Sequence, residues 1–132
     1  MITDKFTFRP RYDEVDQMGY MYHANYVTYC HIARTEMMRK YGICDCYIEQ
    51  QNLMMPVVEM NLKYRCPAHY DEEITIETTI IKEPVVKFAF QFVFINSQNE
   101  IICTADSTIV FVNKEDRKPL RVPDFVLNKL KI

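Results

Sequence analysis

Three residues near the start of the chain have types and spacings that could carry chemistry. Asp16 is followed three positions later by Gly19 and seven positions later by His23. A carboxylate side chain is one of the groups that can act as a general base or as a nucleophile. The first turn of the long helix predicted to follow would present backbone N–H groups that have no partner and carry partial positive charge. Together these groups could promote attack on a carbonyl and stabilise the charge that develops on its oxygen.

Each of these residues also has an ordinary structural explanation. An aspartate upstream of a helix is, taken alone, more often a loop or capping residue. The imidazole of His23 fits a structural role as well as it fits the orientation of substrate or water. Tyr22 and Tyr26 are typical of a pocket wall or a core. Gly19 would let the loop turn closely between the aspartate and the helix.

A long helix predicted over residues 23–41 must position these groups. The only two glycines, Gly19 and Gly42, bracket the stretch, and no proline interrupts it. Gly42 stands where a helix C-cap favours a residue that can take positive φ. The first half of the helix is apolar on most sides, which predicts that this half is enclosed. In the second half, Arg34 and Glu36 are expected to form a structural pair.

The rest of the chain has the alternation of apolar and polar residues that is typical of strands. It predicts strands over residues 4–12, 54–64, 73–83, 87–95 and 100–113. Short turns between the later strands favour an antiparallel meander. A sheet with one apolar face and an apolar helix bury both surfaces when the sheet curls around the helix. The predicted fold class is therefore α+β, with an antiparallel sheet wrapped around one long central helix.

Two strands make specific predictions about which residues face the helix. Four phenylalanines recur at every second position between Phe88 and Phe94. This alternation predicts that their side chains belong to the core, and a role in the wall of an acyl pocket is the second interpretation. In the strand 54–64, alternation places Met60 toward the helix and Val57 on the opposite face.

Length and charge limit the class of protein. A chain of 132 residues with 48% hydrophobic residues fits a single domain, 1–132, with a core of its own. The net charge of -2 and the scattered basic residues argue against a nucleic-acid partner. No apolar run reaches the roughly 20 residues of a membrane span. The N-terminus lacks the charged and apolar regions of a signal peptide, so we expect the cytoplasm.

The cysteines and histidines do not suggest a metal site. The five cysteines are an odd number, which does not suit a complete disulfide framework. Cys44 and Cys46 lack a second cysteine pair, and His31 and His69 have no partner spacing typical of a metal. We therefore expect free thiols and no metal.

A resemblance to a known family rests on two runs within residues 9–42. They are Tyr12-Asp-Glu-Val-Asp16-Gln-Met-Gly19-Tyr-Met-Tyr-His23-Ala-Asn-Tyr26 and Ala33-Arg-Thr-Glu-Met-Met-Arg39. These runs resemble the hotdog-fold acyl-CoA thioesterases of the 4-hydroxybenzoyl-CoA thioesterase class, and above all the branch associated with the bacterial Tol–Pal gene cluster. Elsewhere the match is confined to the strand order and to the segment Asn61-Leu-Lys-Tyr-Arg-Cys-Pro67.

The resemblance implies an acyl-CoA thioesterase that needs no cofactor beyond its substrate. In this family pattern Asp16 is the catalytic carboxylate, either as general base or as a nucleophile that gives a mixed anhydride. The backbone N–H at His23 polarises the thioester oxygen. The expected substrate-binding residues are Gly19, Tyr22, Tyr26 and, near a strand end where the phosphates of coenzyme A would meet a basic group, Arg65.

One departure from the family pattern concerns the catalytic carboxylate. Many relatives carry Asp-Thr-Asp where this chain has Glu14-Val15-Asp16. The final aspartate is kept, but a neighbouring hydroxyl and a shorter acid are missing. Glu14 is therefore a minor rival for the catalytic role.

Other functions and partners stay open at this point. One alternative is a thioesterase that acts on acyl-carrier protein or on an aromatic acyl-CoA, and an acidic carrier protein would favour a basic patch at the pocket mouth. Another is a non-catalytic acyl-CoA-binding hotdog protein in which Asp16 is only structural. Hotdog proteins generally place the active site at a dimer interface, often within a tetramer. Apolar residues on the outer sheet face fit a homo-oligomer, either a dimer or a dimer of dimers.

Overall fold

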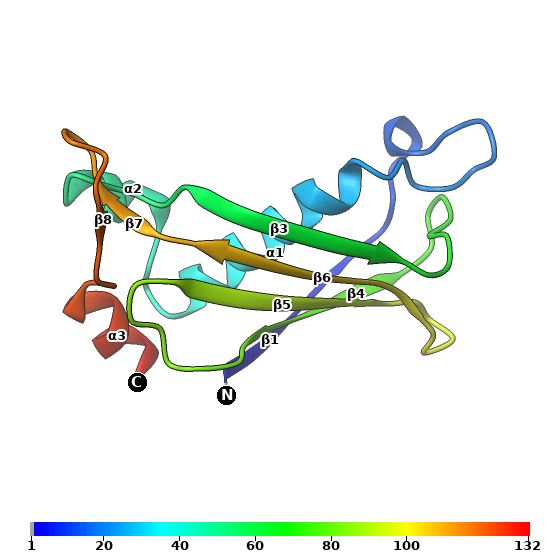
Figure 1. Cartoon of the computed structure of the whole chain (residues 1–132). Helices are drawn as coiled ribbons and strands as arrows, with labels where there is room; N and C mark the ends of the chain where they lie inside the picture. Colours follow the sequence, from blue (N-terminus) through cyan, green and yellow to red (C-terminus); the bar gives the residue numbers. More distant parts are fainter. Residues whose placement is uncertain (1) are drawn as a thin grey trace.

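The computed structural model describes residues 2–132, in which a five-stranded sheet curves around one long helix (Figure 1). The strands of this sheet are β1 (Ile2–Phe8), β3 (Val57–Tyr64), β4 (Ile74–Ile80), β5 (Phe88–Ile95) and β6 (Ile101–Ile109). The remaining elements, apart from the long helix, are short. They are η1 (Tyr12–Glu14), α2 (Asp45–Gln50), β2 (Leu53–Met54), β7 (Phe111–Asn113), β8 (Pro119–Leu120) and α3 (Asp124–Leu130). Among residues 2–132, no helix has the length and apolar character needed to cross a bilayer.

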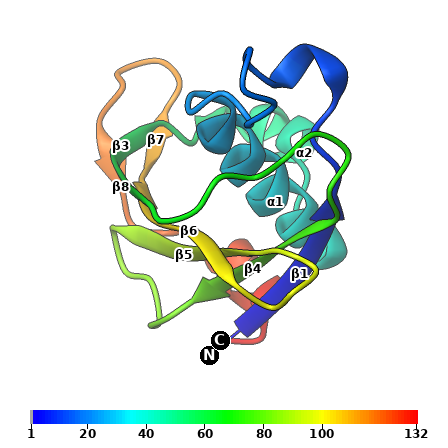
Figure 2. The same ribbon diagram turned by 90° about the vertical axis from the view of Figure 1, so that its right-hand side faces the viewer.

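The central helix α1 spans Asn25–Lys40 and lies in the concave side of the sheet (Figure 2). It starts two residues later than predicted and ends at Lys40. Gly42 follows two residues later with a φ of 78°, the positive value expected just after a helix. The predicted enclosure of its first half is only partly right. Tyr26 and Tyr29 are buried, but Val27 is 44% exposed. The helix therefore buries one side against the sheet and leaves the other side of its first two turns open.

The strand order differs from the predicted meander. The sheet runs β1-β4-β5-β6-β3, with every neighbouring pair antiparallel. β4, β5 and β6 are consecutive, as predicted, but β3 crosses to the far side and pairs with β6 instead of β4. β1 pairs with β4 along its whole length. As a result β3 is an edge strand whose outer side has no partner among residues 2–132.

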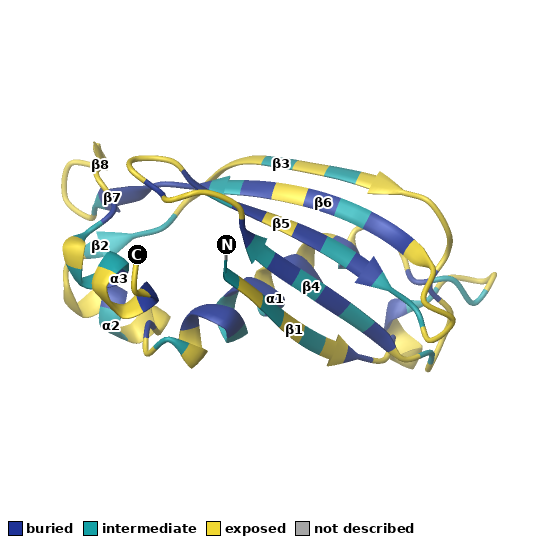
Figure 3. Ribbon diagram, turned by 90° about the horizontal axis from the view of Figure 1, so that it is seen from below, coloured by how far each residue is buried: buried dark blue, intermediate teal, exposed yellow. Residues whose placement is uncertain are grey.

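The phenylalanines of β5 form the centre of the core, as predicted. Phe88, Phe90, Phe92 and Phe94 are each at most 1% exposed. Buried and less buried residues alternate along β4 and β5 (Figure 3), which is the pattern of a sheet with one face packed on a helix. Burying a large aromatic side chain stabilises a fold by about 2–3 kcal/mol.

A β-bulge corrects the prediction for the edge strand. The pairing between β3 and β6 shifts between Val57 and Glu59, so Val58 is the extra residue. The shift reverses the alternation beyond this point. Val57 therefore faces the same cavity as Met60, on the helix side of the sheet and not on the opposite face.

Candidate active site

The loop that carries Asp16 is held by its own side chain. One carboxylate oxygen of Asp16 accepts the backbone N–H of Met18 at 2.9 Å and that of Tyr20 at 3.3 Å. The N–H of Gly19 bonds the carbonyl of Asp16, and Gly19 has a φ of 77° that side chains rarely adopt. The second carboxylate oxygen accepts no hydrogen bond from residues 2–132. The turn thus fixes the carboxyl group while leaving that oxygen free to accept a proton.

The start of α1 presents the unpaired donors that the sequence predicts. The N–H of Asn25 bonds the carbonyl of Tyr22 at 2.9 Å, and the Tyr64 hydroxyl donates to the carbonyl of His23 at 3.0 Å. The N–H groups of His23 and Ala24 donate to no acceptor within residues 2–132. They lie just before the first residue of the helix, where partial positive charge accumulates. Two donors are therefore available for a developing oxyanion.

Glu14 is buried and occupied by structural contacts. Its carboxylate accepts the Tyr29 hydroxyl at 2.6 Å and the Arg11 backbone N–H at 2.8 Å. Its carbonyl accepts the N–H of Tyr22 and the amide of Asn25. Burial, followed by the bond to Glu14, raises the pKa of Tyr29 well above its usual range. Glu14 therefore joins the loop to α1, and its side chain does not line the cavity described next.

A cavity of ≈ 330 Å³ brings most of the predicted site residues together. Asp16, His23, Tyr26 and Arg65 all line it. Gly19 and Tyr22 do not. Gly19 shapes the turn behind Asp16, and the Tyr22 ring stacks obliquely on His23 with centroids 4.4 Å apart. The side chains of Asp16, His23 and Arg65 are exposed, so the cavity is open on that side.

Tyr26 forms the inner wall of this cavity. Its ring is 3% exposed and its hydroxyl oxygen accepts the N–H of Ala68 at 3.3 Å. Burial raises the pKa of Tyr26 to about 12, so the phenol stays protonated near neutral pH. This residue is therefore pocket wall with a polar edge, one of the two roles that its sequence position allowed.

Tyr64 is a site residue that sequence reasoning did not find. It ends β3, lines the cavity, and packs edge-on against Tyr26 with ring centroids 5.1 Å apart. Its hydroxyl holds the peptide that follows His23. Alternation identified Tyr64 only as one apolar residue of a strand, because its contact with His23 joins positions 41 apart in the sequence.

The predicted structural pair on the second half of α1 is wrong. Glu36 bonds Arg39 instead, which lies one turn later on the exposed side of the helix. Arg34 is 6% exposed and donates to the Nδ1 atom of His31 at 3.1 Å. Arg34 and Glu36 are two positions apart, so they point to different sides of the helix.

An antiparallel sheet wrapped around one long helix is the architecture of the hotdog fold, and here Asp16 and His23 line one cavity at the start of that helix. The model of the Thioesterase-like superfamily matches residues 10–130. The chain belongs to this superfamily, which confirms the predicted fold and the predicted class of enzyme.

Individual relatives agree with this assignment. The chain is 32% identical to YneP of Bacillus subtilis (strain 168), which is named provisionally as an acyl-CoA thioesterase, over 92% of this chain and 88% of the relative. It is 27% identical to the acyl-CoA thioester hydrolase YbgC of Escherichia coli O157:H7, over 96% of this chain and 95% of that relative. The DHNA-CoA thioesterase of Staphylococcus aureus superimposes with a TM-score of 0.89 at 26% identity, covering 99% of this chain and 92% of that one. The narrower 4-hydroxybenzoyl-CoA class and the Tol–Pal-associated branch stay predictions.

Proposed function

We propose that this protein hydrolyses acyl-CoA to the free acid and coenzyme A, with Asp16 and the N–H groups at His23 as its catalytic groups. Thioester hydrolysis is the activity of its superfamily, and acyl-CoA is the substrate in the names of its bacterial relatives. One observation carries the choice of residues. Asp16, which keeps one carboxylate oxygen free, and His23, whose N–H has no acceptor among residues 2–132, line one open cavity.

The chemistry requires two groups on opposite sides of the thioester carbonyl. Asp16 accepts a proton from water while the water oxygen attacks the carbonyl carbon. Negative charge then develops on the carbonyl oxygen, where the N–H groups of His23 and Ala24 stabilise it by about 3–4 kcal/mol per donor. The tetrahedral intermediate collapses, the C–S bond breaks, and the thiolate of coenzyme A leaves and takes up a proton. Direct attack by Asp16, through a mixed anhydride that water then cleaves, is the second path that the same contacts allow.

The substrate-binding residues have separate roles in this proposal. Tyr26 and Tyr64 wall the cavity around the thioester, Tyr22 supports the His23 ring, and Gly19 shapes the Asp16 turn. Arg65 is the only lysine or arginine among the described residues that line the cavity, and its side chain is exposed. A single cation suits a phosphate of coenzyme A better than it suits the extended acidic surface of a carrier protein.

Assembly into a homo-oligomer, dimer or dimer of dimers, is part of the proposal. Exposed apolar side chains gather beside the site: Tyr12 is 82% exposed, Met18 is 70% exposed and Tyr22 is 50% exposed. Contiguous exposed apolar surface near a site marks an interaction surface. A second copy covering this loop would close the cavity around Asp16. We propose a cytoplasmic enzyme that uses neither a metal nor a redox cofactor.

The test is release of free thiol from a panel of straight-chain, branched and aromatic acyl-CoAs, with an acyl-carrier-protein thioester beside them. The proposal expects turnover of at least one acyl-CoA. The structural similarity to a DHNA-CoA thioesterase makes aromatic thioesters the second group to test. Tight binding of acyl-CoA without thiol release would instead indicate a binding protein.

A further inference from the structure

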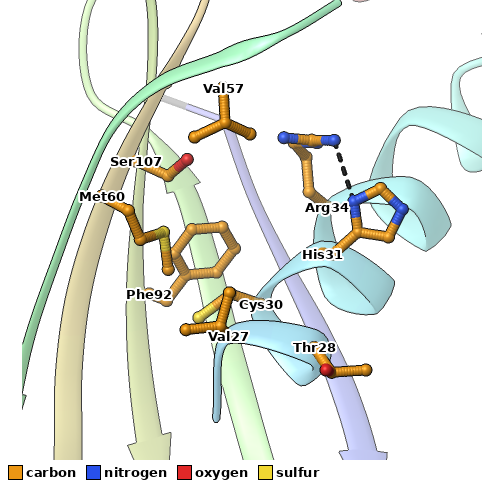
Figure 4. Close-up of a pocket in the computed structure, with 9 residues that line it drawn as sticks. All are labelled: Val27, Thr28, Cys30, His31, Arg34, Val57, Met60, Phe92 and Ser107. Carbon is orange, nitrogen blue, oxygen red and sulfur yellow. Dashed lines mark hydrogen bonds between the residues drawn. The ribbon is translucent and has the colours of Figure 1, made fainter. Parts of the chain in front are cut away.

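A second cavity, of ≈ 370 Å³, continues the same side of α1 beyond the catalytic cavity. The catalytic cavity takes Tyr26 from α1 and Tyr64 from the end of β3. The second cavity is lined by later residues of α1 and by earlier residues of β3, which runs alongside the helix (Figure 4). Its walls are mostly apolar, formed by Val27, Cys30, Val57, Met60 and Phe92. The two cavities therefore follow one another along the space between the helix and the edge strand.

The far part of this apolar cavity holds a buried cation. Arg34 is 94% buried, and one end of its guanidinium bonds His31 while the other end faces Val57 across the cavity (Figure 4). A guanidinium only donates hydrogen bonds, so the Nδ1 atom of His31 accepts here and adds no negative charge. No carboxylate of residues 2–132 forms an ion pair with Arg34.

The surroundings of Arg34 call for an anion. Burial lowers the pKa of Arg34. The carboxylates of Asp45 and Glu49 line a neighbouring cavity with Arg34, and that of Asp45 opposes the effect of burial, but neither forms an ion pair with Arg34. A buried charge is costly unless an opposite charge meets it. The Ser107 hydroxyl also lines the cavity and offers a second donor on the sheet side (Figure 4). A carboxylate accepts from a guanidinium and a hydroxyl at once.

We infer, on the basis of the proposed function, that the second cavity receives the far end of the acyl chain and that Arg34 binds a terminal carboxylate there. The preferred substrates are then CoA thioesters of dicarboxylic acids. Tyr26 and Arg34 are eight positions apart on α1, about 12 Å along its axis, which sets the length of chain that spans both groups. The methylene groups would contact Val27, Met60 and Phe92 between the two ends.

The first test uses the unmodified protein, so that it does not depend on the folding of a variant. A series of linear dicarboxylic mono-CoA thioesters of increasing length is assayed, each beside the monocarboxylic acyl-CoA of equal length. We expect kcat/KM for the dicarboxylic member to exceed that of its partner at the lengths that reach Arg34, by about tenfold to a hundredfold. A preference for the monocarboxylic member at every length would overturn the inference.

The second test changes the cation. Arg34→Gln should lower the dicarboxylic-to-monocarboxylic ratio of kcat/KM by at least tenfold, and Arg34→Lys should restore part of it. Arg39→Gln is the matched control, because Arg39 lies on the same helix but is exposed and bonds Glu36. An equal fall of the ratio in the Arg39→Gln variant, or no fall in Arg34→Gln with folding retained, would contradict a direct role for Arg34.

Binding separates this inference from the catalytic proposal. Calorimetric titration of the Asp16→Asn variant with the same thioester pairs measures affinity without turnover. If the unmodified protein hydrolyses nothing but Asp16→Asn binds dicarboxylic thioesters more tightly, the catalytic proposal fails and the role of Arg34 stands. If hydrolysis occurs and neither rate nor affinity distinguishes the pairs, only the role of Arg34 fails.

Discussion

Replacing Asp16 by asparagine separates chemistry from structure in this protein. The side-chain oxygen of asparagine can still accept the N–H groups of Met18 and Tyr20, which bond the carboxylate at 2.9 Å and 3.3 Å. Gly19 and its turn are unaffected. The amide cannot accept a proton from water, because its second terminal atom is a donor. The substitution therefore removes the base and keeps the loop.

The expected loss of rate in Asp16→Asn depends on the general base that is removed and on the N–H donors that remain. A positioned general base contributes about 10²–10⁴ in rate, or about 2.7–5.4 kcal/mol of transition-state stabilisation. The unpaired donors at His23 remain, so a residual rate above that of water is expected. The free energy of unfolding should change by less than about 0.5 kcal/mol, because the replaced side chain is exposed and its loop hydrogen bonds persist.

The assay compares kcat/KM for thiol release with the thermal midpoint of unfolding. Asp13→Asn is the matched control, since Asp13 is exposed, lies three positions earlier and, within residues 2–132, forms an ion pair only with Arg11, at 3.6 Å. We expect Asp16→Asn to lose a hundredfold or more and Asp13→Asn to lose less than twofold. Equal rates for the unmodified protein and Asp16→Asn, at matched folding, would refute the catalytic role of this carboxylate.

Three further predictions concern the residues that hold the site together. Glu14→Gln weakens the hydrogen bond from the Tyr29 hydroxyl and should lower the free energy of unfolding by about 1–3 kcal/mol. Urea titration measures this change, and a much smaller one would mean that Glu14 acts only as a surface charge. Tyr64→Phe removes the bond to the His23 carbonyl and should lower kcat/KM about fivefold at unchanged thermal midpoint; an unchanged rate would exclude a positioning role. Tyr26 has a folded pKa of about 12 against 10.0 when unfolded, so stability should fall as the pH rises between these values, since the unfolded chain ionises first. Alkaline urea titrations of Tyr26→Phe provide the check, and this variant should show a smaller fall, because Tyr29 also has a raised pKa and still contributes.

Local chemistry made it possible to predict the central helix and most of the residues that line the proposed site. Gly42 indicated where α1 ends, and the spacing of seven positions between Asp16 and His23 predicted a carboxylate close to the start of the helix. These relations span fewer than ten positions and depend on turn geometry and helix periodicity, which neighbouring residues control. The same locality explains why the phenylalanines of β5 were placed correctly in the core.

Contacts between distant segments were not predictable in the same way. Alternation in β3 indicated two faces, but it could not reveal that this strand pairs with β6, or that a bulge after Val57 turns that residue toward the helix. The hydrogen bond between Arg34 and His31 was also missed. Helix spacing alone allows Arg34 several neighbours, and burial in the tertiary structure determines which of them it contacts.

The sequence by itself determined a helix enclosed by strands, and a loop acid seven positions before His23. The tertiary structure decided that Tyr64 lines the same cavity as Asp16 and His23, and that a buried Arg34 lines a second cavity. The physical reason is that hydrogen bonding along the chain acts over one or two turns, whereas the cavities form only where β3 and α1 meet across long separations in sequence.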